Sequence, residues 1–197
     1  MSDSNGPEFK PLEGREFPRF SGIKTFFRLP LASPEDKFDV ALMGVPFDGG
    51  ASYRVGQWFA PQGIRELSSL GRGYHWGRDV TFFKNLRVAD VGDAPTVPID
   101  LKQTYSKVES FASLLLKSDK KILSVGGDHS ITLPILRALH KKYKKPLGLI
   151  HFDAHFDTYP PAWNCEFHHG TFARHAIEEG LVDPKKMVHP YVATTAA

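Results

Sequence analysis

Three residues in the segment 153–157 could bind metal ions together. Asp153, His155 and Asp157 stand at alternate positions, and on an extended segment such side chains share one face with neighbours roughly 6–7 Å apart. Two metal ions about 3.5–4 Å apart fit such a row, with Asp153 bridging them. If these residues only capped a strand end, three polar groups flanked by apolar sequence would repel and desolvate one another. The pattern therefore favours a binuclear metal site.

The donor types narrow the choice of metal. Oxygen and imidazole ligands without a thiolate suit manganese or a similar first-row ion, and iron, cobalt, nickel and zinc stay open. His129 is a further candidate ligand, because Gly126 and Gly127 before it let the backbone turn sharply toward the same edge. Asp128 is expected to orient a metal ligand or to cap the following helix, and the two roles are compatible.

Two histidines in the segment 165–170 are candidates for proton transfer. Either His168 or His169 could act as a proton shuttle, because imidazole titrates near neutral pH. The simpler interpretation of His168 is exposure on the surface. Four other histidines have no comparable setting and are interpreted as ordinary surface or core residues: His140, His151, His175 and His189.

Both clusters follow short apolar runs that are typical of strands. Strands are expected at residues 38–45, 86–92, 121–125 and 147–152. Helices are expected at about 61–67, 105–117, 131–141 and 171–179. Alternating strands and helices are typical of an α/β domain with a mainly parallel sheet, in which ligands collect at the carboxyl ends of the strands. The glycine-rich segment 44–56 lacks the spacing and the lysine of a phosphate-binding loop and is expected to close over the site.

The composition indicates one globular domain and argues against several classes of protein. The hydrophobic share of 41% and the charged share of 24% are ordinary, and a net charge of +3 gives no reason to expect nucleic acid. A single cysteine, Cys165, rules out an intramolecular disulfide or a cysteine-based zinc finger. No apolar run approaches the length of a membrane helix, and residues 1–19 do not resemble a secretory signal. We expect a cytoplasmic protein without a membrane partner.

Three motifs in order resemble those of the ureohydrolase family, which includes arginase, agmatinase and guanidinobutyrase. They are Gly-Val-Pro-Phe-Asp at 44–48, Gly-Gly-Asp-His-Ser at 126–130 and Asp-Ala-His-Phe-Asp at 153–157. The segments 19–26 and 164–171 resemble the agmatinase branch, and the likeness extends from about residue 17 to about residue 183. It implies a three-layer α/β/α sandwich with a mainly parallel sheet, assembled into trimers or hexamers.

The resemblance also implies a role for each site residue. His129, Asp153 and Asp157 would bind one Mn²⁺, and Asp153 and His155 would bind the second. A hydroxide between the two ions would attack the guanidinium carbon, and His169 would pass a proton to the leaving amine. The products would be urea and an amine. Agmatine is the expected substrate, and guanidinobutyrate is the alternative.

The sequence departs from the family after about residue 183. The family has a Phe-Asp-x-Asp-x-x-Asp-Pro motif, which supplies two further aspartate ligands, and a later glutamate, which binds the guanidinium. Neither occurs in this sequence. We therefore expect an N-terminal arm at 1–36, an arginase-like domain at 37–187 that is incomplete at its C-terminus, and an aberrant tail at 188–197. An incomplete domain would expose a sheet edge, bind the second metal weakly and have impaired activity.

Two alternatives to this hydrolase remain open. One is a catalytically inactive truncated isoform that serves as a metal-binding or oligomer-forming partner. The other is a metal-dependent deacylase on the related fold, against which the segment 165–171 argues.

Overall fold

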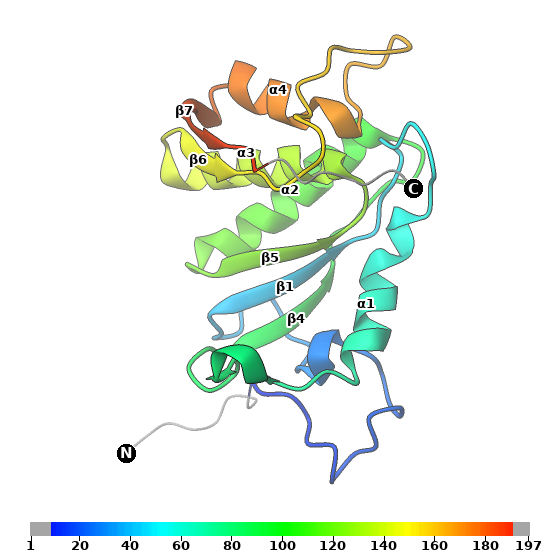
Figure 1. Cartoon of the computed structure of the whole chain (residues 1–197), viewed down its shortest axis with the longest axis vertical. Coiled ribbons are helices and arrows are strands. Elements are labelled where there is room, and N and C mark those ends of the chain that lie inside the picture. Colours follow the sequence, from blue (N-terminus) through cyan, green and yellow to red (C-terminus); the bar gives the residue numbers. More distant parts are fainter. Residues whose placement is uncertain (1–8, 191–197) are drawn as a thin grey trace.

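A parallel sheet of three strands forms the centre of the computed structural model, which describes residues 9–190. Strand β1 (Val40–Val45) lies between β4 (Val88–Asp93) and β5 (Lys121–Gly126), as Figure 1 shows. Both pairings are parallel. The prediction of an α/β domain with a mainly parallel sheet is confirmed.

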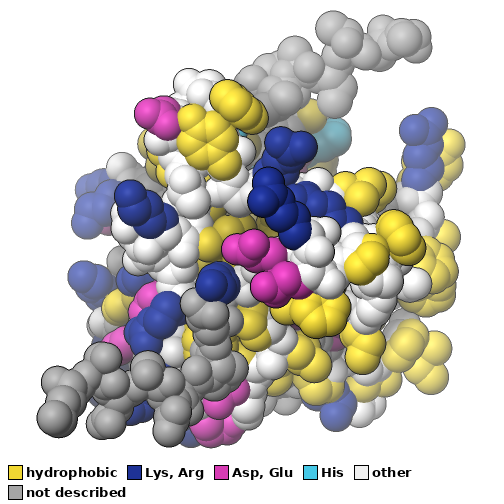
Figure 2. Space-filling model, turned by 90° about the horizontal axis from the view of Figure 1, so that it is seen from below, with side chains coloured by type: hydrophobic (Ala, Val, Ile, Leu, Met, Phe, Trp, Pro, Cys, Tyr) yellow, Lys and Arg dark blue, Asp and Glu magenta, His cyan; other side chains and the backbone are white. Residues whose placement is uncertain are grey.

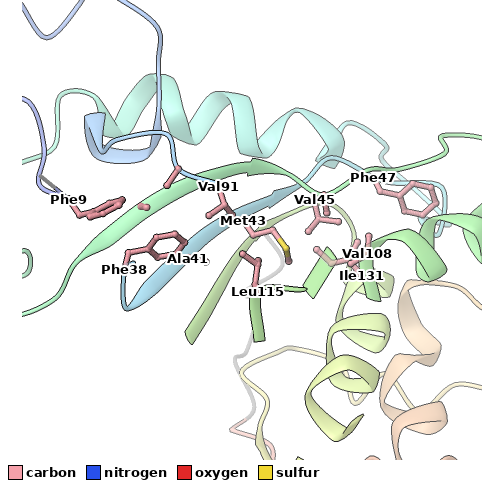
Figure 3. Packing of buried hydrophobic residues seen from close by; sticks show 13 residues of the cluster. Phe9, Phe38, Ala41, Met43, Val45, Phe47, Val91, Val108, Leu115 and Ile131 are labelled. Atoms are coloured by element: carbon pink, nitrogen blue, oxygen red, sulfur yellow. The ribbon is translucent and has the colours of Figure 1, made fainter. Parts of the chain in front are cut away.

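Four helices connect and cover the strands. They are α1 (Ala60–Ser68), α2 (Leu101–Lys117), α3 (Thr132–Tyr143) and α4 (Phe172–Glu178). Figure 3 shows α1 on one side of the sheet and the α2 side chains of Val108 and Leu115 on the other, so the layers are α/β/α. Helices α3 and α4 share a second apolar cluster, which also contains Leu181 and Val182 from the chain segment that follows α4.

Helix α2 shows how the sequence pattern becomes structure. Its fully buried residues Val108, Ala112 and Leu115 recur at helical spacing and face the sheet or α3. The helix begins at Leu101, earlier than the predicted 105, because the Asp100 carboxylate accepts a hydrogen bond from the Gln103 amide at 2.9 Å and caps the helix.

Two further strands form a separate parallel pair. They are β6 (Leu147–Ile150) and β7 (Val182–Val188), and β7 was not predicted. Its sequence is polar and contains Pro184, which has no amide proton for a strand hydrogen bond. The structure accommodates Pro184 where the register of the β6–β7 pairing shifts.

Within residues 9–190, β5 pairs only with β1 and β6 pairs only with β7, so strand edges are exposed. Large apolar side chains on and beside these strands are more than half exposed: Leu123, Ile150, Phe152, Phe156 and Val188. The face of the molecule in Figure 2 carries basic and acidic side chains side by side, with apolar side chains between them. No helix of the described residues is long and apolar enough to cross a membrane.

The remaining elements are short. They are the antiparallel strands β2 (Tyr74–His75) and β3 (Val80–Thr81) and the 3-10 turns η1 (Phe26–Arg28), η2 (Gln57–Phe59), η3 (Trp76–Arg78), η4 (His129–Ile131) and η5 (His169–Thr171).

The described part of the N-terminal segment lies on the flank of the domain itself. Phe9 and Ala32 belong to the main apolar core, and Phe26 and Leu29 pack against strands β1 and β4. The division of the chain at residues 36 and 187 stays a prediction. Residues 191–197 of the predicted tail lie outside the described residues.

A buried ion pair joins α1 to β4, and its carboxylate also binds the N-terminal flank. The Asp90 side chain is fully buried and accepts hydrogen bonds from Arg65 Nε at 2.8 Å and Nη2 at 3.0 Å. The same carboxylate accepts the backbone amides of Phe26 at 2.9 Å and Gly92 at 2.8 Å. Four donors compensate for the removal of this charge from water.

We predict that Asp90→Ala lowers the free energy of unfolding by about 3–5 kcal/mol, because it leaves the Arg65 charge buried without its main partner. The control is Asp39→Ala, which breaks the exposed pair between Asp39 and Arg87 and should cost only a small part of that loss. Urea unfolding of the full chain measures both. Equal losses in the two variants would contradict the importance assigned to the buried pair.

Candidate metal centre

Four potential metal ligands converge beyond the ends of β5 and β6. His129 follows β5, and His151, Asp153 and Asp157 follow β6. One donor atom from each residue lies within 4.8 Å of the other three. The His129 Nδ1 atom is 2.7 Å from a carboxylate oxygen of Asp157 and 3.1 Å from one of Asp153. The structure therefore brings together three of the predicted ligands and one histidine that was not predicted.

Gly127 allows the loops after β1 and β5 to meet. Its amide donates a hydrogen bond to the Val45 carbonyl at 3.1 Å, and the Asp128 amide donates to the Phe47 carbonyl at 2.8 Å. A Cβ atom at Gly127 would lie 2.1 Å from that Phe47 oxygen. The glycine is thus required by close backbone approach and not by a positive φ, which neither Gly126 nor Gly127 has.

Asp157 turns its carboxylate back toward His129 by adopting a left-handed backbone. Its φ is 51°, a conformation that aspartate tolerates better than most residues. Its carbonyl oxygen accepts the amides of Ala173 at 3.1 Å and Arg174 at 3.3 Å. The start of α4 therefore holds the residue in this conformation, and its carboxylate is buried.

His155 lies outside the group of four. The segment from Asp153 to Asp157 is not an extended strand, because the Asp153 carboxylate accepts the amide of His155 at 2.9 Å and bends the chain. The His155 side chain is 65% exposed. Its Nδ1 atom is 3.5 Å from Asp153 Oδ1, whereas His129 and His151 face Asp153 Oδ2. Its role as a metal ligand stays a prediction.

His151 was interpreted as an ordinary residue, yet the structure places it in the group. Its side chain is buried, and neither ring nitrogen has a hydrogen-bond partner among the described residues. Its Nε2 atom is 3.5 Å from Asp153. A signal was present in the sequence, since His151 extends the alternating row of Asp153, His155 and Asp157 by one step toward β6.

The local environment keeps His151 and Asp153 in metal-binding protonation states. Burial and the neighbouring charge of His129 lower the pKa of His151, so its imidazole is neutral at neutral pH. Burial acts to raise the pKa of Asp153, but the backbone hydrogen bond from His155 and the nearby histidines outweigh it and lower that pKa. Asp153 is therefore ionised, as a metal ligand must be.

The donor set fits a divalent first-row cation. Two carboxylates and two imidazoles offer oxygen and nitrogen without thiolate, and one of the two unpartnered nitrogens of His151 would gain a partner. Among residues 9–190 this is the one group of at least three such side chains close enough to hold an ion.

His169, the predicted proton shuttle, borders two pockets beside this group. It lines a pocket of about 440 Å³ together with His129 and a pocket of about 390 Å³ together with Asp157. Its neighbour His168 is more than a surface residue, because its Nδ1 atom accepts the Gly170 amide at 3.2 Å and caps η5.

Asp128 shows one of its two predicted roles. Its carboxylate accepts the amide of Ser130 at 2.7 Å, which caps η4. Its other oxygen accepts the amide of Gly50 at 2.8 Å. Both oxygens are thus bonded to backbone amides, and in the described residues neither is bonded to a metal ligand.

Comparison with known proteins identifies relatives of this chain. The arginase family model matches residues 38–193. A guanidinopropionase from Pseudomonas aeruginosa is 45% identical over 91% of this chain and 56% of the relative. An agmatinase from Chromobacterium violaceum is 38% identical over 89% of this chain and 55% of the relative. The chain thus spans a little over half the length of these relatives.

Solved structures share the fold. The proclavaminate amidinohydrolase of Streptomyces clavuligerus superposes with a TM-score of 0.82 at 41% identity, over 87% of this chain and 57% of that chain. A Trypanosoma cruzi formiminoglutamase solved with Mn²⁺ superposes with a TM-score of 0.69 at 26% identity, over 77% of this chain and 51% of that chain.

We predict that the full chain binds Mn²⁺ and that Asp157→Asn weakens this binding more than about tenfold, because a buried anionic donor is lost. Loss of the free Mn²⁺ signal in electron paramagnetic resonance measures the affinity. Asp119→Asn is the control, since Asp119 is 92% exposed and remote from the group. Equal affinities in the two variants would exclude Asp157 as a ligand.

The same titration distinguishes the two histidines. If the group of four holds the ion, His151→Gln weakens Mn²⁺ binding more than about tenfold. If Asp153 and His155 bind a second ion, His155→Gln weakens the binding of that ion. Weaker binding in His155→Gln alone would show that His155 is the ligand and that the buried ring of His151 only packs beside the site.

Proposed function

The chain belongs to the arginase family, and from this premise we propose that it hydrolyses the guanidino group of a small compound to urea and an amine. One observation carries the proposal: a group of carboxylates and imidazoles that fits a divalent cation lies beside a pocket that His169 also lines. The open pocket gives a small substrate access to both parts of the site.

We assign the metal ligands as follows. His129, Asp153 and Asp157 hold one Mn²⁺, and Asp153 with His155 holds the second. The donor chemistry supports this metal, and so does the presence of Mn²⁺ in the structure of the Trypanosoma cruzi relative. A bound divalent cation lowers the pKa of water and so supplies a nucleophile near neutral pH.

His169 supplies the proton that the leaving group needs. An amine departs poorly unless its nitrogen is protonated, and an imidazole can deliver a proton near neutral pH. His169 is well placed for this role because it lines the same pocket as His129. The carboxylates of Asp153 and Asp157 hold the metal and offset part of its positive charge.

Agmatine is the proposed substrate, and guanidinobutyrate is the alternative. The far end of agmatine carries an ammonium group, which donates hydrogen bonds, whereas guanidinobutyrate ends in a carboxylate. The Gln57 Oε1 atom is an acceptor without a partner among the described residues, and Gln57 lines the pocket. An unpartnered acceptor favours the ammonium end. Similarity to a guanidinopropionase keeps the alternative of a substrate that ends in a carboxylate.

A second candidate is metal binding without turnover, as part of a larger assembly. Two observations favour it. The four converging donors suffice for one ion, and apolar side chains are exposed at strands with unpaired edges. Assembly into trimers or hexamers of this chain is part of this candidate, and light scattering measures it.

We predict that the full chain with Mn²⁺ releases urea from agmatine faster than from guanidinobutyrate or guanidinopropionate. Colorimetric urea detection measures the rate, and Asp157→Asn should abolish it. Bound Mn²⁺ without urea from any of the three would support the second candidate. Acetate release from acetylated polyamines without urea would instead identify a deacylase.

A further inference from the structure

The segment 47–56, between β1 and η2, is held against His169 at several points. The Gly50 carbonyl accepts the backbone amide of His169 at 2.9 Å, and the Ser52 Oγ atom is 2.8 Å from the His169 Nε2 atom. The segment is closed on itself by Asp48, whose carboxylate accepts the Gly56 amide at 2.6 Å. We call this segment the β1 loop.

Asp128 anchors the β1 loop from the opposite side. Its buried carboxylate accepts the Gly50 amide at 2.8 Å, and a hydrogen bond to an ionised acceptor is stronger than a neutral one. Gly50 has to be glycine for this contact. A Cβ atom there would lie 2.7 Å from the Ser130 Oγ atom and 3.0 Å from the Asp128 Oδ1 atom.

The backbone of Gly50 therefore links two elements. Its amide is bound by Asp128 after β5, and its carbonyl is bound by His169 at the start of η5. The turns η4 and η5 also contact each other directly. Ser52 is two residues further along the same loop, so the position of its hydroxyl depends on the anchored Gly50.

The ring of His169 is consequently held at one nitrogen. The Nε2 atom is bonded to Ser52, and the Nδ1 atom has no hydrogen-bond partner among the described residues. A serine hydroxyl can donate to Nε2 or accept from it, and where it donates, the neutral ring carries its proton at Nδ1. Proton transfer also requires the exchanging nitrogen to lie within hydrogen-bond reach of its target.

We propose that Ser52, fixed by the anchored β1 loop, positions the His169 ring by binding Nε2, so that Nδ1 is the nitrogen that exchanges a proton with the leaving amine. This inference rests on the proposed function, in which His169 is the proton donor. Ser52 is a positioning residue, because its hydroxyl is hydrogen-bonded to His169 and not to the candidate metal donors. It adds the β1 loop to the machinery of the site.

The test is nitrogen NMR of the full chain with ¹⁵N-labelled histidine, without metal or substrate. The pH is held about 1.5 units above the ordinary imidazole pKa of ~6.5, so that the rings are neutral. The His169 signals are assigned by their loss in His169→Gln. We expect two well-separated ring shifts in the unmodified chain, which indicate one dominant tautomer.

Three serine variants decide the role of the hydroxyl. In Ser52→Ala the two His169 ring shifts should move toward each other, because the ring loses its partner and samples both tautomers. Ser52→Thr keeps a hydroxyl and should restore the separation. Ser106→Ala, which removes an exposed hydroxyl on α2, should leave it unchanged. Unchanged His169 shifts in Ser52→Ala would overturn the inference, whether or not the chain releases urea.

Two glycine variants test the anchor. Gly50→Ala places a methyl group against Ser130 and Asp128 and should displace the β1 loop, reproducing the effect of Ser52→Ala on His169. Gly63→Ala is the matched control, because its methyl group meets nothing within 4 Å on α1. If Gly50→Ala leaves the His169 shifts unchanged, the anchor has no role. Ser52 is exposed, so its variants remain informative even if Gly50→Ala does not fold.

Turnover gives an independent readout. Where urea is released, Ser52→Ala should lower kcat about tenfold with little change in KM, since proton transfer and not substrate binding is impaired. Ser52→Thr should recover most of the rate. A raised KM with unchanged kcat would show that Ser52 binds substrate and would overturn the positioning role.

Discussion

The close approach of two backbone segments, after β1 and after β5, is the constraint on which the site depends. Gly127 permits it, because any Cβ atom would collide with the Phe47 carbonyl. Once the segments touch, their amides and carbonyls satisfy one another, and Asp128 can reach the Gly50 amide. The direction of His129 and the position of the β1 loop both follow from this contact. A larger residue at Gly127 would therefore disturb a candidate metal donor, His129, and the loop beside His169 at once.

At the candidate metal donors, the cost of burying polar groups exceeds what their hydrogen bonds to the described residues offset. Burial of His151 and Asp157 costs free energy, and the described residues offset this cost only in part, since both nitrogens of His151 lack partners. The fold nevertheless holds the donors together through contacts elsewhere: α4 binds the carbonyl of Asp157, and Asp153 binds the amide of His155. Such a preorganised group is suited to a cation, which supplies the missing compensation.

Much of the fold could be predicted from local patterns. Short apolar runs located β1, β4, β5 and β6, helical spacing located α2, and proline at the first turn located α1, because these signals arise within a few residues. Strand β7 could not be predicted from the sequence, because it is polar and contains Pro184. Its pairing with β6 depends on a shift of register that only the partner strand reveals. The packing of Phe9 and Phe26 against the domain could not be predicted either, since it depends on strands that are distant in the sequence.

The sequence by itself determined the chemistry: carboxylates and imidazoles immediately after two strands, with glycines before one of them, indicate a metal site of the arginase type. The tertiary structure decided which side chains converge. It brought in His151 and left His155 exposed, because the bend at Asp153 and the left-handed backbone of Asp157 interrupt the alternation that the sequence suggested. It also joined Ser52 to His169, 117 positions apart. Spacing reports only local geometry, whereas these contacts depend on hydrogen bonds between segments that meet only after folding.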